Sequence, residues 1–154
     1  KVGSQPDLTE KNLITELEYS IDYIKRRSSK KVSFDFQYPN PNMQVKMNVI
    51  LFNWVIENLL KNALDAIDGI GDIVIKVEED TDHAIIDISD SGKGIPRSKQ
   101  KTVFEPGYST KKRGWGLGLT LAKRITESYH KGKIFVKQSA PGKGTTFRII
   151  LPKS

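Results

Sequence analysis

The segment Glu57-Asn58-Leu59-Leu60-Lys61-Asn62-Ala63-Leu64-Asp65-Ala66 lies in the most strongly helical part of the chain. Apolar residues recur at helical spacing from about residue 48 to residue 67, which predicts a long, largely buried helix. Asparagine is a poor helix former because its side chain competes for backbone hydrogen bonds. Here Asn58, Asn62 and Asp65 stand at i, i+4 and i+7 and share one face. That polar stripe either faces solvent or supplies oxygen ligands to a hard cation such as Mg²⁺.

Other helical and strand patterns flank this helix on both sides. Asp7-Leu8-Thr9-Glu10 resembles a helix start, with a capping residue followed by Glu three positions later. The patterns predict helices over 7–27, 48–67 and 117–129, and strands over 32–36, 43–47, 73–77, 84–88, 134–137 and 145–151. We therefore expect one domain over residues 1–154, an α/β (α+β) two-layer sandwich. Its sheet is mixed and mostly antiparallel, with about five or more strands and about three helices on one face.

Composition excludes several kinds of site. The 154 residues contain no cysteine, so disulfides, thiolate metal sites and a cysteine nucleophile are excluded. His83 and His130 are too few for a histidine metal cluster. No apolar run approaches the roughly 20 residues of a membrane-spanning helix, and Lys1–Pro6 is not a signal peptide.

The charge is basic and uneven. The net charge is +7, and a run of cations between residues 97 and 113 is opposed only by Glu105. A basic protein binds nucleic acid, an anionic membrane or a phosphorylated small molecule, or it carries a solvated lysine-rich face. Charge alone leaves these alternatives open.

Two glycine-containing stretches have chemistry that suits a nucleotide. Asp90-Ser91-Gly92-Lys93-Gly94-Ile95 follows a strand, where a carboxylate can accept from an exocyclic amine and glycines permit close approach. Gly114-Trp115-Gly116-Leu117-Gly118-Leu119 leads into a helix, and the N–H groups of a helix start bind phosphate. The second stretch matches neither the dinucleotide fingerprint nor the Walker A loop. Taken alone, each stretch is weak evidence.

The motifs are specific in combination. Five motifs occur in a fixed order between about Asp7 and Leu151: Asn-x-x-x-Asn-Ala, Asp-x-Gly-x-Gly, Phe-Glu-Pro, Gly-x-Gly-Leu-Gly-Leu and Gly-x-Gly-Thr-Thr-Phe. Together they resemble the catalytic ATP-binding domain of sensor histidine kinases, a Bergerat-type fold shared with gyrase, the MutL mismatch-repair protein and the large heat-shock chaperone. Ser109-Thr110-Lys111 also resembles the Thr-Thr-Lys lid segment of nitrogen-regulation-type kinases.

The resemblance implies ATP and Mg²⁺ as cofactors and assigns roles by position. It makes Asn62 the Mg²⁺ ligand, with Asn58 lining the nucleotide pocket. It makes Asp90 the acceptor of the adenine amine, and it places Thr145 or Thr146 beneath the ring. It makes Gly92, Gly94 and Ile95 walls of the pocket and Lys111 a candidate γ-phosphate contact. The other phosphate contacts that it implies are Thr110, Gly116, Leu117, Gly118 and Leu119.

Two positions depart from the pattern. Many sensor kinases carry Lys or Arg three residues after the Mg²⁺ asparagine, where this chain has Asp65. Phosphate neutralisation then depends more on Lys61, Lys111 or Lys112. Other ATPases of the superfamily have a glutamate at the position of Asn58, which argues against autonomous hydrolysis and leaves Glu57 as a weakly supported assistant base.

The acceptor histidine of such kinases is missing from the sequence. It stands in a His-Glu/Asp-x-x-x-Pro context, which neither His83-Ala84-Ile85 nor His130-Lys131-Gly132 provides. The resemblance therefore implies a separate dimerisation domain as phosphoacceptor, with Lys1–Pro6 as the tail end of that region. It also implies a downstream response regulator, a homodimeric full-length protein and a cytoplasmic fragment of a membrane-anchored bacterial receptor, without direct membrane contact.

Three functions compete at this point. The leading hypothesis is a kinase domain that binds Mg·ATP and donates the γ-phosphoryl group to a histidine. An anti-sigma-factor-type serine kinase, or another ATPase of the superfamily, is the closest alternative. A nucleic-acid-binding module would need aromatics interleaved with the basic run. Only Phe104, Tyr108 and Trp115 occur there, inside motifs that the kinase hypothesis explains, so we expect no nucleic-acid partner.

Overall fold

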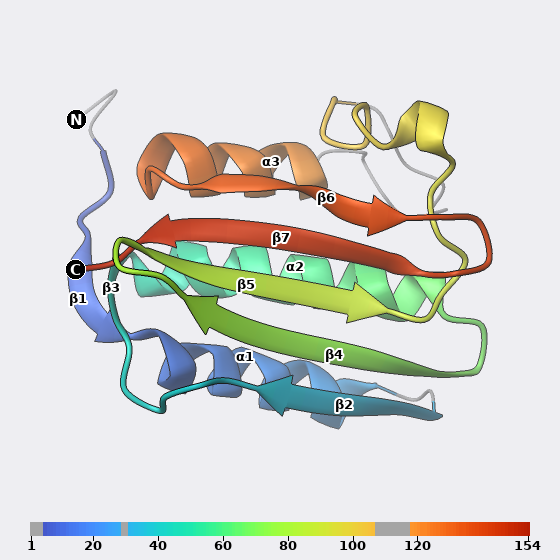
Figure 1. Ribbon diagram of the computed structural model, residues 1–154, viewed down its shortest axis with the longest axis horizontal. Helices are drawn as coiled ribbons and strands as arrows, with labels where there is room; N and C mark the ends of the chain where they lie inside the picture. Colours follow the sequence, from blue (N-terminus) through green and yellow to red (C-terminus); the bar gives the residue numbers. More distant parts are fainter. Residues whose placement is uncertain (1–4, 29–30, 107–117) are drawn as a thin grey trace.

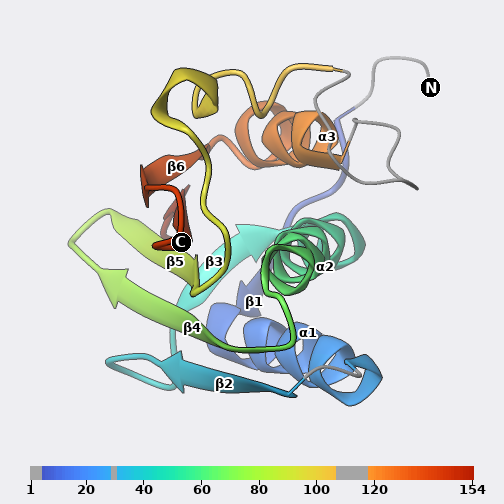
Figure 2. The same cartoon turned by 90° about the vertical axis from the view of Figure 1, so that its right-hand side faces the viewer.

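The computed structural model describes residues 5–28, 31–106 and 118–154. A five-stranded sheet in the order β2-β4-β5-β7-β6 is covered on one face by three helices of the described residues, and β1 and β3 form a small separate sheet (Figures 1 and 2). The elements are β1 (Thr9–Asn12), α1 (Leu13–Arg27), β2 (Lys31–Gln37), β3 (Gln44–Met47), α2 (Val49–Ala66), β4 (Ile70–Glu79), β5 (His83–Asp90), a 3₁₀ turn (Arg97–Lys99), α3 (Gly118–Arg124), a π-helical turn (Ile125–Tyr129), β6 (Lys133–Ser139) and β7 (Thr145–Pro152). The predicted two-layer α/β sandwich is confirmed.

The strand pairing agrees with the mixed, mostly antiparallel sheet that the sequence predicts. The β4–β5 and β6–β7 pairs are antiparallel hairpins. The consecutive strands β2 and β3 do not pair with each other. Instead β2 lies parallel to β4, and β3 is antiparallel to β1. The sheet is therefore mixed, with one parallel pair.

The predicted helix start at Asp7 is wrong. Thr9–Asn12 is a strand, paired residue by residue with Met47 back to Gln44. The helix α1 begins at Leu13, and the Asn12 side chain caps it by accepting a hydrogen bond from the Ile14 backbone N–H at 3.1 Å. A local capping signal is a weak preference that tertiary pairing overrides. Here the pairing with β3 shifts the helix start past the Asp7–Glu10 box.

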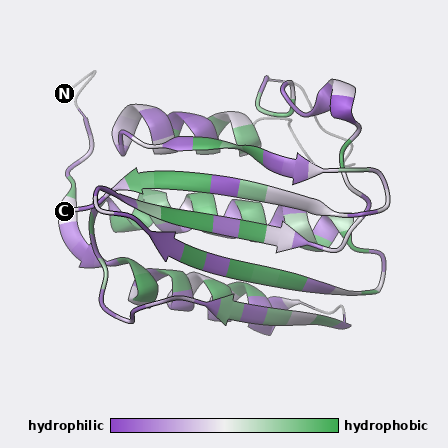
Figure 3. Ribbon diagram, viewed as in Figure 1, coloured by the Kyte–Doolittle hydropathy of each residue, from purple (hydrophilic) through white to green (hydrophobic). Residues whose placement is uncertain are grey.

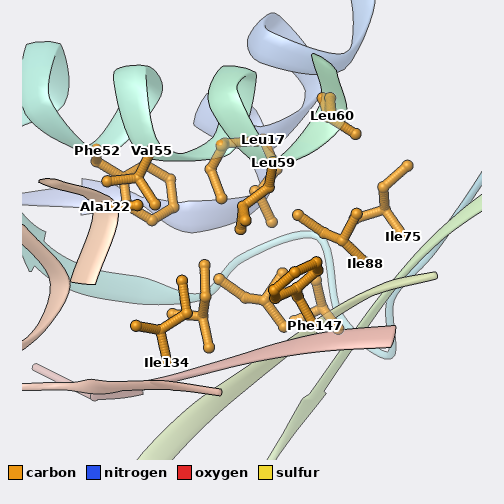
Figure 4. Packing of buried hydrophobic residues seen from close by; sticks show 14 of the residues in the cluster. Leu17, Phe52, Val55, Leu59, Leu60, Ile75, Ile88, Ala122, Ile134 and Phe147 are labelled. Atoms are coloured by element: carbon orange, nitrogen blue, oxygen red, sulfur yellow. The ribbon is translucent and has the colours of Figure 1, made fainter. Parts of the chain in front are cut away.

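The core lies between the sheet and the helices. Alternate residues of β4, β5 and β7 point to the helices and are buried, among them Ile75, Ile88 and Phe147. They pack against Leu17 of α1 and Leu59 of α2 (Figure 4). Along the strands, hydrophilic and hydrophobic residues alternate (Figure 3). This period of two places Asp90 and Thr145, paired at the ends of β5 and β7, on the helix-facing side of the sheet.

The helices of the described residues are all too short or too polar to cross a membrane.

A buried histidine joins the two helices that frame the site. The ring of His130 is 3% exposed. Its Nε2 lies 3.1 Å from the backbone N–H of Asn48, the N-cap of α2, and its Nδ1 lies 2.9 Å from the carbonyl oxygen of Ile125. Because Nε2 accepts and Nδ1 donates, the neutral ring with its proton on Nδ1 fits both partners. Burial lowers the pKa of His130 below its ordinary value of 6.5, although the hydrogen bond to the Ile125 carbonyl opposes the shift.

We expect the stability of the fold to depend on His130 below neutral pH. A histidine whose pKa is lowered by folding contributes fully to the stability of the folded state above its unfolded pKa of about 6.5. That contribution is lost as the pH falls. Between about pH 7.5 and 5.5, the wild type should lose on the order of 1 kcal/mol more than His130→Gln in its free energy of unfolding. Urea titrations at each pH measure this difference. Equal pH dependence in His130→Gln and the wild type would rule out a neutral His130 as the link between Asn48 and Ile125.

Candidate functional site

The polar stripe of α2 does not simply face solvent. Asn58 and Asn62 are half-buried, whereas Lys61 and Asp65 are exposed. Asn58 lies against the first residue of α3, because a Cβ added at Gly118 would stand 2.9 Å from the Asn58 Oδ1. A glycine at this position therefore lets the start of α3 approach the asparagine. Leu119, which follows, packs against the core.

One atom of the stripe lacks a partner. The Asn58 Nδ2 is buried and has no hydrogen-bond partner among the described residues. Leaving a buried amide donor unpaired costs about 1–3 kcal/mol. Such a donor in a glycine-lined contact is suited to a ligand with acceptor oxygens.

The loop after β5 closes on the far end of the same helix. Asp90 ends the strand, and its Oδ1 accepts a hydrogen bond from the Gly92 N–H at 2.8 Å. The Lys93 N–H then donates to the carbonyl oxygen of Ala66 at 2.9 Å. A Cβ at Gly92 would stand 2.4 Å from that oxygen, so only glycine fits. The loop thereby fixes Asp90 against the C-terminal turn of α2.

Asp90 is a carboxylate in a partly desolvated place. Burial raises its pKa, while hydrogen bonds from the backbone N–H groups of Gly92 and Thr145 oppose the rise. Those two donors stabilise the ionised form and leave the remaining lone pairs of the carboxylate as acceptors. The group is therefore suited to accept from a ligand N–H.

The turn between β6 and β7 supports the other side of the loop. Gly94 has φ +76°, and a Cβ there would overlap the Ala140 carbonyl oxygen. Ile95, half-buried against the core, donates its N–H to the Ser139 Oγ at 2.7 Å. A hollow of about 380 Å³ opens at this end of the sheet, and residues of both faces line it: Asp90, Ser139 and Thr145 from the helix-facing side, and Ser89 and Thr146 from the other.

The structure separates the two threonines. Thr145 pairs with Asp90 and lies on the helix-facing side of the sheet. Thr146 pairs with Ser89 on the opposite side, and their hydroxyl oxygens are 2.7 Å apart. Of the two residues that the sequence offered for the base, only Thr145 shares a face with Asp90.

Several predicted site residues cannot be placed. Thr110, Lys111, Lys112, Gly116 and Leu117 lie outside the described residues. Of the rest, Asn58 and Gly118 meet halfway along α2, and Asp90, Gly92 and Thr145 gather near its C-terminal end. Sequence reasoning did not single out Ser139, because its position depends on strand register.

A second hollow lies on the outer side of the helices. Its volume is about 610 Å³, and it is lined by Tyr19, Ile50, Leu51, Asn53, Trp54, Glu57, Leu121, Ile125 and Tyr129. We call it the helical groove. Ile50 is 81% exposed and Tyr19 is 60% exposed. Glu57, which immediately precedes Asn58, connects this groove to the Asn58–Gly118 contact.

Comparison with known proteins identifies the family. Residues 48–154 match the family of histidine kinase-, DNA gyrase B- and HSP90-like ATPases. The chain belongs to this ATPase family. The match includes α2, the Asp90 loop, α3 and the β6–β7 hairpin, so it contains all the site residues that the sequence predicted.

Relatives of this ATPase domain are histidine kinases. Sporulation kinase C of Bacillus subtilis is 38% identical over 98 residues, which are 64% of this chain and 22% of that protein. Sensor histidine kinase ZraS of Salmonella typhi is 34% identical over 143 residues, 92% of this chain and 30% of that protein. The chain thus spans less than a third of the length of these curated relatives.

Solved structures agree with the family assignment. The catalytic domain of histidine kinase ThkA superposes with a TM-score of 0.86 and 28% identity, covering 96% of this chain and 97% of that domain. ThkA in complex with the response regulator TrrA superposes with a TM-score of 0.83 and 26% identity, covering 96% of this chain and 42% of that one.

We expect Gly92→Ala to damage the site of this ATPase domain. The added methyl meets the Ala66 carbonyl, so the loop must shift, at a cost of about 1–3 kcal/mol in stability. The Asp90 carboxylate moves with the loop, and ATP affinity should fall at least about tenfold. Calorimetric titration and urea unfolding measure the two effects.

Gly69→Ala is the matched control. Gly69 has φ +83° with nothing within 4 Å of an added Cβ, so alanine introduces only backbone strain, about 1–2 kcal/mol. This variant should lose stability and keep its ATP affinity. Unchanged ATP affinity in folded Gly92→Ala would contradict the role of the loop.

Proposed function

We propose that this chain is the catalytic domain of a sensor histidine kinase, which binds Mg·ATP and donates its γ-phosphoryl group to a histidine on a separate dimerisation domain. One observation carries the proposal: α2 carries at Asn58 a buried amide donor without a partner among the described residues, and the loop that holds the Asp90 carboxylate is bonded through Lys93 to Ala66 of the same helix. Eight residues of helix separate the two places, about 12 Å. This spacing suits a nucleotide lying along the helix, with its base at Asp90 and its phosphates at Asn58.

The base end recognises adenine by its amine. The Asp90 carboxylate accepts from the exocyclic N–H, and Thr145 lies beside it on the same face. Gly92, Gly94 and Ile95 form the wall, because their backbones pack directly against Ala66, Ala140 and Ser139.

The phosphate end combines amides, a helix start and a cation. No cluster of three or more His, Asp or Glu that could hold a metal ion occurs among the described residues. Mg²⁺ commonly uses one or two protein oxygens together with substrate phosphates, a requirement that the amide oxygen of Asn62 fits. The bound ion would neutralise phosphate charge. Asn58 donates to phosphate oxygens, and Gly118 and Leu119 bring the start of α3 close to them.

The catalytic work of this domain is positioning. Phosphoryl transfer depends on in-line placement and charge stabilisation more than on covalent chemistry by the protein. Lys61 is exposed and available to phosphate charge, and Lys111, with Thr110, Lys112, Gly116 and Leu117, stays a sequence-based assignment to the same end. Glu57 is the acidic residue nearest to this end along α2 and serves as an assistant base.

The helical groove receives the acceptor domain. Four of its large apolar side chains are exposed, Tyr19, Ile50, Trp54 and Leu121, and such a group on a monomeric domain indicates an interaction site. It begins at Glu57, beside the phosphate-binding Asn58, and it includes Leu121, three residues after Gly118. A helix seated in this groove lies next to the γ-phosphate, where a histidine acceptor must be. A small-molecule acceptor would need no such surface.

Other partners follow from the relatives. The named homologues are sensor kinases, and ThkA is known with a bound response regulator. We accordingly propose that the parent protein passes phosphate to a response regulator. The homodimeric, membrane-anchored receptor that the sequence resemblance implies stays a prediction. The kinship with histidine kinases also favours this function over a serine kinase.

Asp90→Asn tests the adenine assignment. The amide presents a donor where the carboxylate accepted, so ATP affinity should fall at least about tenfold in a folded protein. Asp87→Asn is the matched control, because Asp87 lies on the opposite face of β5 in an ion pair with Arg148 at 2.8 Å. That control should lower the unfolding midpoint and leave affinity intact. Calorimetric titration measures the ATP affinity of both variants. An Asp90→Asn variant with wild-type affinity would contradict the adenine assignment.

Ile50→Glu tests the acceptor surface. Ile50 is 81% exposed, so the change should leave the fold and ATP affinity intact. A charge in the groove should slow transfer to the separately supplied dimerisation domain of the parent kinase at least about tenfold. Ile70→Glu, at a residue 77% exposed outside the groove, is the control and should transfer normally. The measurement is acid-labile phosphate on the acceptor. Equal transfer by Ile50→Glu and Ile70→Glu, or acid-labile phosphate on the isolated catalytic domain, would contradict this part of the proposal.

A further inference from the structure

A bulge in β6 brings an additional hydroxyl to the base end of the site. The pairing of β6 with β7 shifts by one residue between Val136 and Gln138. Strict alternation from Val136, which pairs with Phe147, would place Gln138 opposite Thr145. The bulge instead places Ser139 opposite Thr145. Bulges next to functional sites re-aim side chains in this way.

The Ser139 hydroxyl lies at a junction of three partners. Its Oγ accepts from the Ile95 N–H at 2.7 Å. It donates to the Gly144 carbonyl oxygen at 3.0 Å. The Thr145 Oγ1 is 2.8 Å away, and either oxygen can be the donor of that bond.

Counting protons fixes the direction of the third bond. A serine hydroxyl has one proton and two lone pairs. Because the Ser139 proton goes to the Gly144 carbonyl, the Thr145 hydroxyl must donate to Ser139. This arrangement satisfies all three contacts, whereas the reverse direction leaves Ser139 with no proton for Gly144. The Thr145 Oγ1 then presents only lone pairs to its remaining surroundings.

We propose that Ser139 is a positioning residue that holds the Thr145 hydroxyl as an acceptor beside Asp90, so that the site selects a 6-amino purine over a 6-oxo purine. The inference rests on the proposed binding of ATP at Asp90. Two acceptors on one face match the two N–H groups of an amine. A 6-oxo group adds lone pairs where the site offers no proton, and an unmatched polar contact of this kind is a strong basis for discrimination.

The test compares ATP with inosine triphosphate, which has a 6-oxo group on an otherwise similar purine. In the wild type, the dissociation constant of inosine triphosphate should exceed that of ATP at least about tenfold. Ser139→Ala frees the Thr145 proton to turn toward a 6-oxo group, so this ratio should fall at least about fivefold. Ser139→Thr keeps the hydroxyl and should keep the ratio.

Ser89→Ala is the matched control. It removes the hydroxyl that pairs with Thr146 one rung along the same strands, on the opposite face. The ratio should stay at the wild-type value. Calorimetric titration supplies both dissociation constants, and thermal unfolding establishes that each variant is folded.

The outcomes separate this inference from the proposed function. If Ser139→Ala weakens both nucleotides by the same factor, Ser139 only supports the loop and the inference is overturned. If the wild type binds ATP and inosine triphosphate equally, the adenine assignment of Asp90 fails instead. Thr145→Val gives a second route should Ser139→Ala not fold: removing the Thr145 lone pairs should also lower the ratio, and an unchanged ratio would overturn the inference.

Discussion

The site depends on the hydrogen bond that the Asp90 loop donates to the carbonyl oxygen of Ala66. This carbonyl is one of the last of α2, and the end of a helix leaves such groups without an intrahelical partner. The Lys93 N–H satisfies it at 2.9 Å, and Gly92 packs so closely that a side chain has no space. A helix-capping requirement thus holds the Asp90 loop on the helix that also carries Asn58 and Asn62. The two ends of the site are fixed by one rigid element.

The sheet completes this geometry through alternation and one exception to it. Because side chains alternate along a strand, Asp90 and Thr145 face the helices and Ser89 and Thr146 face away. The bulge in β6 then reverses the alternation once, so that Ser139 joins the helix-facing set. A single inserted residue therefore decides which hydroxyl network borders the proposed base site.

The sequence predicted the elements with strong periodicity and missed features that depend on pairing. The helix over 48–67 matches α2 at Val49–Ala66, because its apolar spacing is dense and Asn48 caps it. The predicted start of α1 at Asp7 was wrong, because the pairing of Thr9–Asn12 with β3 overrode the local capping signal. The motif Gly-x-Gly-Thr-Thr-Phe could not decide between Thr145 and Thr146, since a face is defined only by register. Ser139 was missed for the same reason, because a bulge has no signature in the residues of one strand.

The helix α2 divides its surface among three tasks, and this division explains how nucleotide and acceptor are brought together. Leu59 and Leu60 are buried in the core, Asn58 and Asn62 carry the proposed phosphate contacts, and Ile50 and Trp54 line the helical groove. His130 fixes the first turn of the helix through Asn48, and the Asp90 loop fixes the last. A helix held at both ends keeps the groove and the phosphate end in a constant relation. Under the proposed function, an acceptor docked in the groove would therefore meet the phosphoryl group without any rearrangement of α2.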